Sequence, residues 1–299
     1  MKTDRTLGLT ALGAAIVLGA AGYLITGGEE GGKNIRQVES AADTSHISGD
    51  GHWKLPAEAY LPNKEQRKLI AHARGIAIEQ CMKGKGFSYR APSSIPLPDD
   101  GTGNLTDGRY GIHDRAKAAR FGYHPDPELQ VQRAKAMDAS SKSFKASPEP
   151  ERRALMGSTS SMNDGCVQEA KQKFAGTSAQ NSRAVKIANE AYDQAKADVR
   201  VKRVFAGWAA CMHNQGFSYS EPMQANDDVK FATRTPTEQE IKAAVADVDC
   251  RVRNDVNKVW YETEKDYQNR LISRSSDELE MTRRRVAHSV SEARSLIKG

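Results

Sequence analysis

The chain has 299 residues, enough for one large domain or two small ones. Its hydrophobic share of 38% and charged share of 27% suit a soluble, rather polar body, and with only 6% aromatic residues any core must rely on aliphatic side chains. The net charge of +6 comes from interleaved basic and acidic residues, so nothing indicates nucleic acid as a partner.

The N-terminus carries an uncharged apolar run from Leu7 to Ile25, preceded by two basic residues. A run of this length can span a bilayer, and the basic flank predicts that the N-terminal end stays in the cytoplasm. Residues 1–26 are therefore predicted to be a transmembrane anchor, or alternatively a cleaved signal segment. Both alternatives place the rest of the chain outside the cytoplasm, either on a single-pass membrane protein or on a secreted one.

Residues 27–55 are rich in Gly, Ser and acidic residues, which is typical of a flexible linker. The remainder, 56–299, is predicted to be one extracytoplasmic helical domain. Its first half covers about 60–180 and its second half about 181–299, because one nine-residue pattern occurs once in each half. The two copies, at 81–89 and 211–219, share Cys, Met, Gly, Phe, Ser and Tyr in the same order.

The first predicted helix covers Asn63–Lys85, with Asn63 and Gln66 as a capping box. Gly86 follows as a left-handed stop, and the two aromatic residues after it are expected to pack back on the helix. A loop at 91–108 leads to a short helix from Asp114 to Phe121. A second short helix follows Pro148 and stops at Gly157, and a third begins at Cys166.

The second copy of the pattern repeats this arrangement. A helix of roughly twenty residues is predicted to end at Gly216, followed by the same aromatic exit. From Thr237 to about Lys298 the chain contains neither Pro nor Gly, which predicts a long C-terminal helix. Its expected buried stripe consists of Ile241, Val245, Val248, Val252, Val256 and Val259. Beyond Leu271 the apolar pattern fades, so we expect the helix to fray or project there.

Four cysteines in an oxidising compartment favour two disulfides. Each half has one Cys at a helix end and a later one inside a helix, which predicts the pairs Cys81–Cys166 and Cys211–Cys250. The alternative pairing of Cys81 with Cys211 and Cys166 with Cys250 would join the halves to each other. Free buried thiols or a metal site are further alternatives. The fold class expected is thus mainly α: a helical bundle of two related disulfide-linked units with long loops and a long C-terminal helix.

No familiar catalytic, phosphate-binding or metal-binding motif occurs in the sequence. His213 follows Cys211 closely, but Lys83 replaces it in the first copy. No catalytic residue, cofactor or metal site is therefore predicted. The candidate ligand or packing surface consists of the aromatic residues near the helix ends and the central loop: Phe87, Tyr89, Tyr110, Tyr123, Trp208, Phe217 and Tyr219.

Several short motifs occur in a fixed order. They are the pattern at 81–89, Arg-Tyr-Gly-Ile at 109–112, Phe-Gly-Tyr at 121–123, Ala-Leu-Met-Gly at 154–157, Gly-Cys at 165–166, Trp-Ala-Ala-Cys-Met at 208–212 and Ala-Asp-Val-Asp-Cys at 246–250. In this order they resemble uncharacterised secreted or membrane-anchored proteins of actinobacteria, over about residues 60–270. The chain lacks the lipid-attachment Cys of lipoprotein-like members. The resemblance implies an exported, disulfide-bonded protein and brings no enzyme activity or ligand.

The function expected from these features is non-enzymatic: a membrane-tethered binding or accessory protein of the cell envelope. Its partners would be the membrane, through the N-terminal helix, and an envelope protein or cell-wall polymer. The alternative is an envelope hydrolase whose active site follows no recognised motif.

Overall fold

The computed structural model describes residues 53–92, 108–158, 164–175 and 182–299. These residues form eleven α-helices and two short 3-10 helices, without a β-strand, which confirms the mainly α-helical fold class. The predicted anchor at 1–26 and most of the predicted linker at 27–55 lie outside the described residues. Among the helices that are described, none has both the length and the apolar character needed to cross a membrane.

The helices follow one another along the chain with short connections. In order they are η3 (Pro56–Tyr60), α1 (Lys64–Gly84), α2 (Arg115–Phe121), α3 (Pro127–Ala146), α4 (Glu149–Met156), α5 (Cys166–Lys173), α6 (Arg183–Ala197), α7 (Val199–Asn214), α8 (Pro222–Asn226), η6 (Val229–Phe231), α9 (Glu238–Arg253), α10 (Val256–Ser273) and α11 (Ser276–Lys298).

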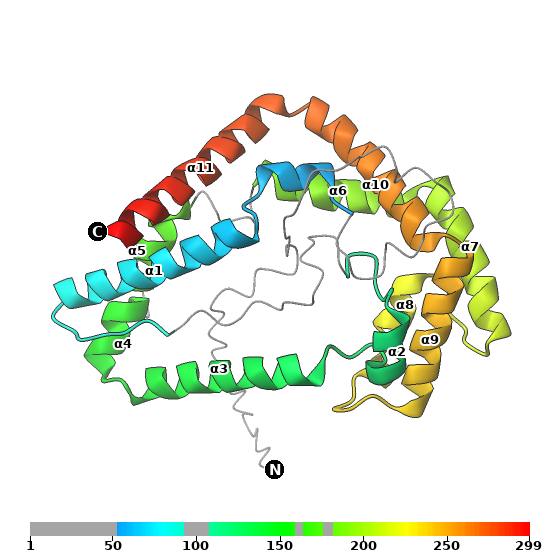
Figure 1. Ribbon diagram of the computed structural model, residues 1–299, viewed down its shortest axis with the longest axis horizontal. Coiled ribbons are helices and arrows are strands. Elements are labelled where there is room, and N and C mark those ends of the chain that lie inside the picture. The colour runs from blue at the N-terminus through cyan, green and yellow to red at the C-terminus, as the bar shows by residue number, and fades with distance from the viewer. Residues whose placement is uncertain (1–52, 93–107, 159–163, 176–181) are drawn as a thin grey trace, which may run out of the picture.

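The two halves of the chain interlock. α11 lies along α1, α10 lies along α6, and α9 packs against α2, α7 and α8 (Figure 1). α2 thus belongs to the first half by sequence but packs on a helix of the second, and α11 does the reverse. α3 runs along the edge of the molecule from α2 towards α4 (Figure 1). None of its described side chains is buried.

Both predicted disulfides are present. Cys81 is bonded to Cys166, which joins α1 to α5, and Cys211 is bonded to Cys250, which joins α7 to α9. The alternative pairing across the halves is therefore wrong, and no free thiol remains among the described residues. Each bridge connects helices within one half of the chain.

The repeated pattern forms the same helix end in both copies. The Phe87 amide donates to the Met82 carbonyl at 2.9 Å and the Gly86 amide donates to the Lys83 carbonyl at 3.0 Å, which is the Schellman arrangement. The second copy has the equivalent bonds, both at 3.0 Å. Gly86 and Gly216 both have φ of +86°, in the left-handed region. Within each copy, Met and Phe belong to the same apolar cluster: Met82 with Phe87 in one, and Met212 with Phe217 in another. Such a contact often accompanies this motif. The conserved order of Met, Gly and Phe within the pattern thus follows from backbone geometry.

Two glycines of the first copy provide a matched test of this assignment. Gly86→Ala is expected to destabilise the protein by about 1 kcal/mol, because a Cβ strains a left-handed residue. Gly84→Ala is expected to stabilise it by about 0.5–1 kcal/mol, since Gly84 is the last helical residue of α1 and a Cβ there meets open space. Urea unfolding of both variants measures the difference. Equal effects of the two substitutions would contradict the Schellman assignment.

The C-terminal third differs from the single long helix expected from the sequence. It consists of three helices, interrupted at Asn254–Asp255 and again at Arg274–Ser275. Asp255 is left-handed with φ of 51°, and the Asn254 side chain donates to the Cys250 carbonyl at 2.8 Å. Asn and Asp break helices in this way because their short polar side chains bond to nearby backbone. The prediction of a single helix from Thr237 to about Lys298 is therefore wrong, and the longest of the three helices is α11, with 23 residues.

The expectation that the chain frays or projects beyond Leu271 is wrong. Leu279, Val286, Val290 and Ala293 of α11 are buried, and the last three pack with Ile70 and Ala73 of α1. The apolar spacing is present in this segment, but Arg283, Arg284 and Arg285 obscure it because they cover only the solvent side of the helix.

The predicted valine stripe is also only partly the buried face. Val248 and Val256 are buried, but Val252 is 52% exposed. The side of α9 that lies in the interior instead includes Glu240, Asp247 and Arg251, all less than 3% exposed. Residues of opposite charge can occupy a core when they pair with each other, and a search for apolar periodicity does not find them.

Three α-helices were not expected from the sequence: α3, α6 and the five-residue α8. α6 precedes α7 and is separated from it only at Asp198, whose side chain caps α7 by accepting from the Arg200 amide. α3 occupies the segment between the predicted short helix that ends at Phe121 and the one that follows Pro148. Its sequence is rich in Ala, Lys and Ser and has little apolar periodicity, as expected for a helix that is solvated along its length.

Candidate functional site

The candidate aromatic residues divide between two places. Tyr110 and Trp208 are buried in the cluster around the Cys211–Cys250 disulfide, and Tyr123, Phe217 and Tyr219 pack against it. Phe87 and Tyr89 instead pack with Met82 around the Cys81–Cys166 disulfide. The second aromatic exit therefore meets the Tyr110 and Tyr123 segments, and the first does not.

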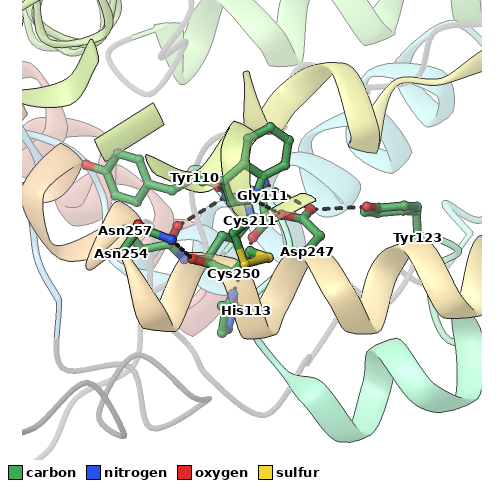
Figure 2. A network of polar contacts seen from close by, with 11 residues as sticks. Tyr110, Gly111, His113, Tyr123, Cys211, Asp247, Cys250, Asn254 and Asn257 are labelled. Atoms are coloured by element: carbon green, nitrogen blue, oxygen red, sulfur yellow. Dashed lines mark hydrogen bonds and ion pairs between the residues drawn. A yellow bond between two sulfur atoms is a disulfide. The ribbon is translucent and has the colours of Figure 1, made fainter. Parts of the chain in front are cut away.

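A fully buried carboxylate lies at the centre of the larger cluster (Figure 2). Asp247 of α9 accepts hydrogen bonds from Trp208 Nε1 at 2.8 Å and from the Tyr123 hydroxyl at 3.1 Å. Arg251, one helical turn further on, donates to it through Nε at 2.6 Å and Nη2 at 3.3 Å. The Asp247 side chain thus links α9 to α7 and to the turn after α2.

The Arg251 guanidinium extends the network from Asp247 towards α10. Its Nη1 donates to the Tyr110 backbone carbonyl and, at 3.2 Å, to Asn257 Oδ1 (Figure 2). The side chain of Arg251 is 1% exposed and that of Asp247 is fully buried. Burial raises the pKa of Asp247, and the positive charge and hydrogen bonds of Arg251 oppose that shift.

A second buried carboxylate lies beside the turn that contains Arg109 and Tyr110. Glu264 of α10 accepts two hydrogen bonds from Arg109 Nε, at 2.9 and 3.0 Å, and one from the Tyr110 hydroxyl at 2.8 Å. Gln268 donates to it at 2.7 Å and accepts from the Ala57 amide at 2.9 Å. Burial and the nearby Glu264 charge raise the pKa of Tyr110. Tyr110 therefore connects the two carboxylates: its hydroxyl donates to Glu264, and its backbone carbonyl accepts from Arg251, which is paired with Asp247.

Aromatic rings close the space between the two carboxylates. The Trp260 ring lies 5.0–5.2 Å from those of Tyr110, Tyr192 and Phe205, measured between ring centroids. Arg109 lies over the Tyr192 ring at 4.8 Å. Such packing excludes water, which strengthens each ion pair and makes any unpaired charge costly.

One carboxyl group near this network titrates close to neutral pH. Burial raises the pKa of Glu58, in η3, to about 7, although its hydrogen bond from the Leu55 amide at 3.1 Å opposes the shift. The segment before it is also fixed: Trp53 stacks on Tyr261 with centroids 4.5 Å apart, and the Tyr261 hydroxyl donates to the Lys54 carbonyl at 2.9 Å. The linker predicted to end at residue 55 therefore joins the helical body on α10.

The described residues bring one group of metal-ligand types together: Cys81, Cys166 and Glu169, whose ligand atoms lie within 4.8 Å of one another. Both sulfurs are bonded to each other. A metal requires thiolate sulfur, which a disulfide does not offer. This group is therefore not a metal site in the oxidised protein.

Four residues of this network carry charge and are not among the candidates predicted from the sequence: Arg109, Asp247, Arg251 and Glu264. Two spacings could have indicated them. Asp247 and Arg251 are four residues apart, as are Glu264 and Gln268, so each pair lies on one helix face. The same spacing is common on solvated helices, and only the covering by neighbouring helices distinguishes the two cases.

Comparisons with known proteins assign neither a family nor a function to the chain. No protein-family model, curated protein or solved structure matches the chain.

Proposed function

We propose that this chain is a non-enzymatic binding or accessory protein of the cell envelope, held at the membrane by its N-terminal segment. The observation that carries the proposal is the closure of the buried network. Asp247, Glu264 and Glu240 are fully buried carboxylates of the kind an acid–base mechanism would need, and each accepts hydrogen bonds from donors of its own chain. Groups bound in this way connect helices and are not available to a substrate.

The location is supported by the disulfides. Both bonds join helices of the body, and such bonds persist in oxidising compartments outside the cytoplasm. The apolar run at 7–25 supports membrane attachment, and the linker after it would reach the body at Trp53. Alkaline washing of membranes and protease treatment of intact cells test this part. Recovery of the chain in the cytosol would contradict it.

The surface we expect to contact a partner is the outer face of α11. It exposes Arg283, Arg284, Arg285, Arg294 and Lys298. Glu280 pairs with Arg283 at 2.6 Å and Arg284 at 3.1 Å. α11 carries five basic and four acidic residues in all, so its positive charge is concentrated in the run Arg283–Arg285. A positive helix face suits an anionic wall polymer or an acidic patch on an envelope protein.

Crosslinking in intact cells tests the binding role. A photoreactive residue in place of Arg284 is expected to form products with one envelope component. The same residue in place of Val199, which is 68% exposed at the start of α7, provides the control and is expected to form none. Failure to recover any envelope protein or wall fragment from either position would contradict the proposed function.

A further inference from the structure

A histidine outside the central network has acceptors at both ring nitrogens. His124 lies in the turn between α2 and α3, with its side chain 15% exposed. Its Nε2 is 2.7 Å from the Thr233 backbone carbonyl, and its Nδ1 is 2.7 Å from Glu240 Oε1 on α9. A carbonyl oxygen only accepts, so Nε2 must carry a proton.

The second proton, between Nδ1 and Glu240, belongs on the histidine. Glu240 Oε1 already accepts from the Tyr123 amide at 2.8 Å, and this carboxylate lies in the first turn of α9, where the helix favours negative charge. With protons on both nitrogens, His124 is an imidazolium clamped between two acceptors. The hydrogen bond to Thr233 and the charge of Glu240 raise the pKa of His124, and burial opposes them.

Glu240 is the acidic group that acts on His124, because the other carboxylates near the turn have other partners. Tyr123 beside it is directed to Asp247, which Arg251 neutralises. Asp126, on the other side of the turn, caps α3 by accepting from the Glu128 amide at 2.9 Å. The close approach of the turn to Glu240 also depends on Gly122. This residue has a φ of 59°, and an added Cβ would lie 2.5 Å from Glu240 Oε1.

We propose that His124 and Glu240 form a pH-sensitive latch that fixes the α2–α3 turn, and with it the start of α3, to the N-terminus of α9. In the closed latch His124 is protonated and donates to both acceptors. Deprotonation leaves a lone pair of Nδ1 facing the Glu240 carboxylate, and the contact is lost. Since no described side chain of α3 is buried, its attachment depends on its two ends.

The direction of the pH effect follows from the raised pKa. Stabilisation by the latch is complete below the ordinary histidine pKa of about 6.5 and is lost as the pH rises through the higher pKa of the closed state. The latch therefore holds in mildly acidic surroundings and opens in alkaline ones. Local opening should increase about tenfold for each unit by which the closed pKa exceeds the open one.

Hydrogen exchange of the full-length chain between pH 5.5 and 8.5, corrected for intrinsic exchange rates, measures this opening. Peptides covering 121–130 are expected to lose protection as the pH rises, and those from α6 are not. His124→Gln should abolish the difference, whereas His72→Gln, at an exposed position on α1, should leave it unchanged. Glu240→Gln keeps an acceptor without its charge and should lower the His124 midpoint in an NMR titration. A wild-type midpoint at or below 6.5, or pH-independent protection of the turn, would overturn the proposal.

Discussion

Replacement of Arg251 by methionine is expected to destabilise the protein by about 3–5 kcal/mol, because it leaves Asp247 as an unpaired buried charge. It also removes the donor to the Tyr110 carbonyl. Chemical denaturation at pH 7 measures the loss. Arg253→Met, two residues further along α9 at an exposed position, is the control and should cost within about 0.5 kcal/mol.

Two further measurements separate charge from packing in this variant. Without Arg251, only the hydrogen bonds from Trp208 and Tyr123 oppose the upward shift that burial causes in the pKa of Asp247, so the folded variant favours the neutral carboxyl. A raised folded pKa gives stability at low pH that is lost as the pH rises above the unfolded value of about 3.9. The cost should therefore be smaller at pH 4 than at pH 7. The double variant Asp247→Asn with Arg251→Met should recover part of the stability; a double variant no better than Arg251→Met would show that packing dominates.

Removal of the disulfide between α7 and α9, by Cys211→Ala with Cys250→Ala, is expected to cost about 4 kcal/mol. The bond closes a loop between cysteines that are 39 residues apart in the sequence. It also holds Trp208 of α7 beside Asp247 of α9. Urea unfolding, followed by Trp fluorescence, measures the cost. A loss below about 1 kcal/mol would indicate that helix packing alone sets this geometry.

The corresponding removal of Cys81–Cys166 provides a comparison within the same chain. Its separation of 85 residues predicts a similar cost from chain entropy, about 4–5 kcal/mol. Its position differs, since it joins α1 to α5 and lies in the cluster with Phe87 and Tyr89. We therefore expect the central network, and the fluorescence of its tryptophans in the folded state, to stay unchanged in this variant.

Features with a local cause could be predicted from the sequence. The capping box at Asn63, the glycine stops and the aromatic exits depend on residues within one or two turns of the helix end. The disulfide pairing could be predicted because the two copies of the pattern imply the same connection in each half. Residues 254–255 and 274–275, in contrast, read as helix because neither pair contains Gly or Pro.

The helices and their two equivalent ends follow from the sequence, because hydrogen bonds and side chains close in sequence specify them. The disulfide pairing follows from the repeated pattern rather than from local contacts, since the paired cysteines are 85 and 39 residues apart. Which helix faces are inside depends on contacts between distant segments. α2 and the Arg109–Tyr110 turn cover α9 across more than 110 residues of chain, and that covering turns Asp247 and Arg251 from an ordinary surface pair into a core ion pair. Burial removes water from charges, and no spacing along the chain records where the water is excluded.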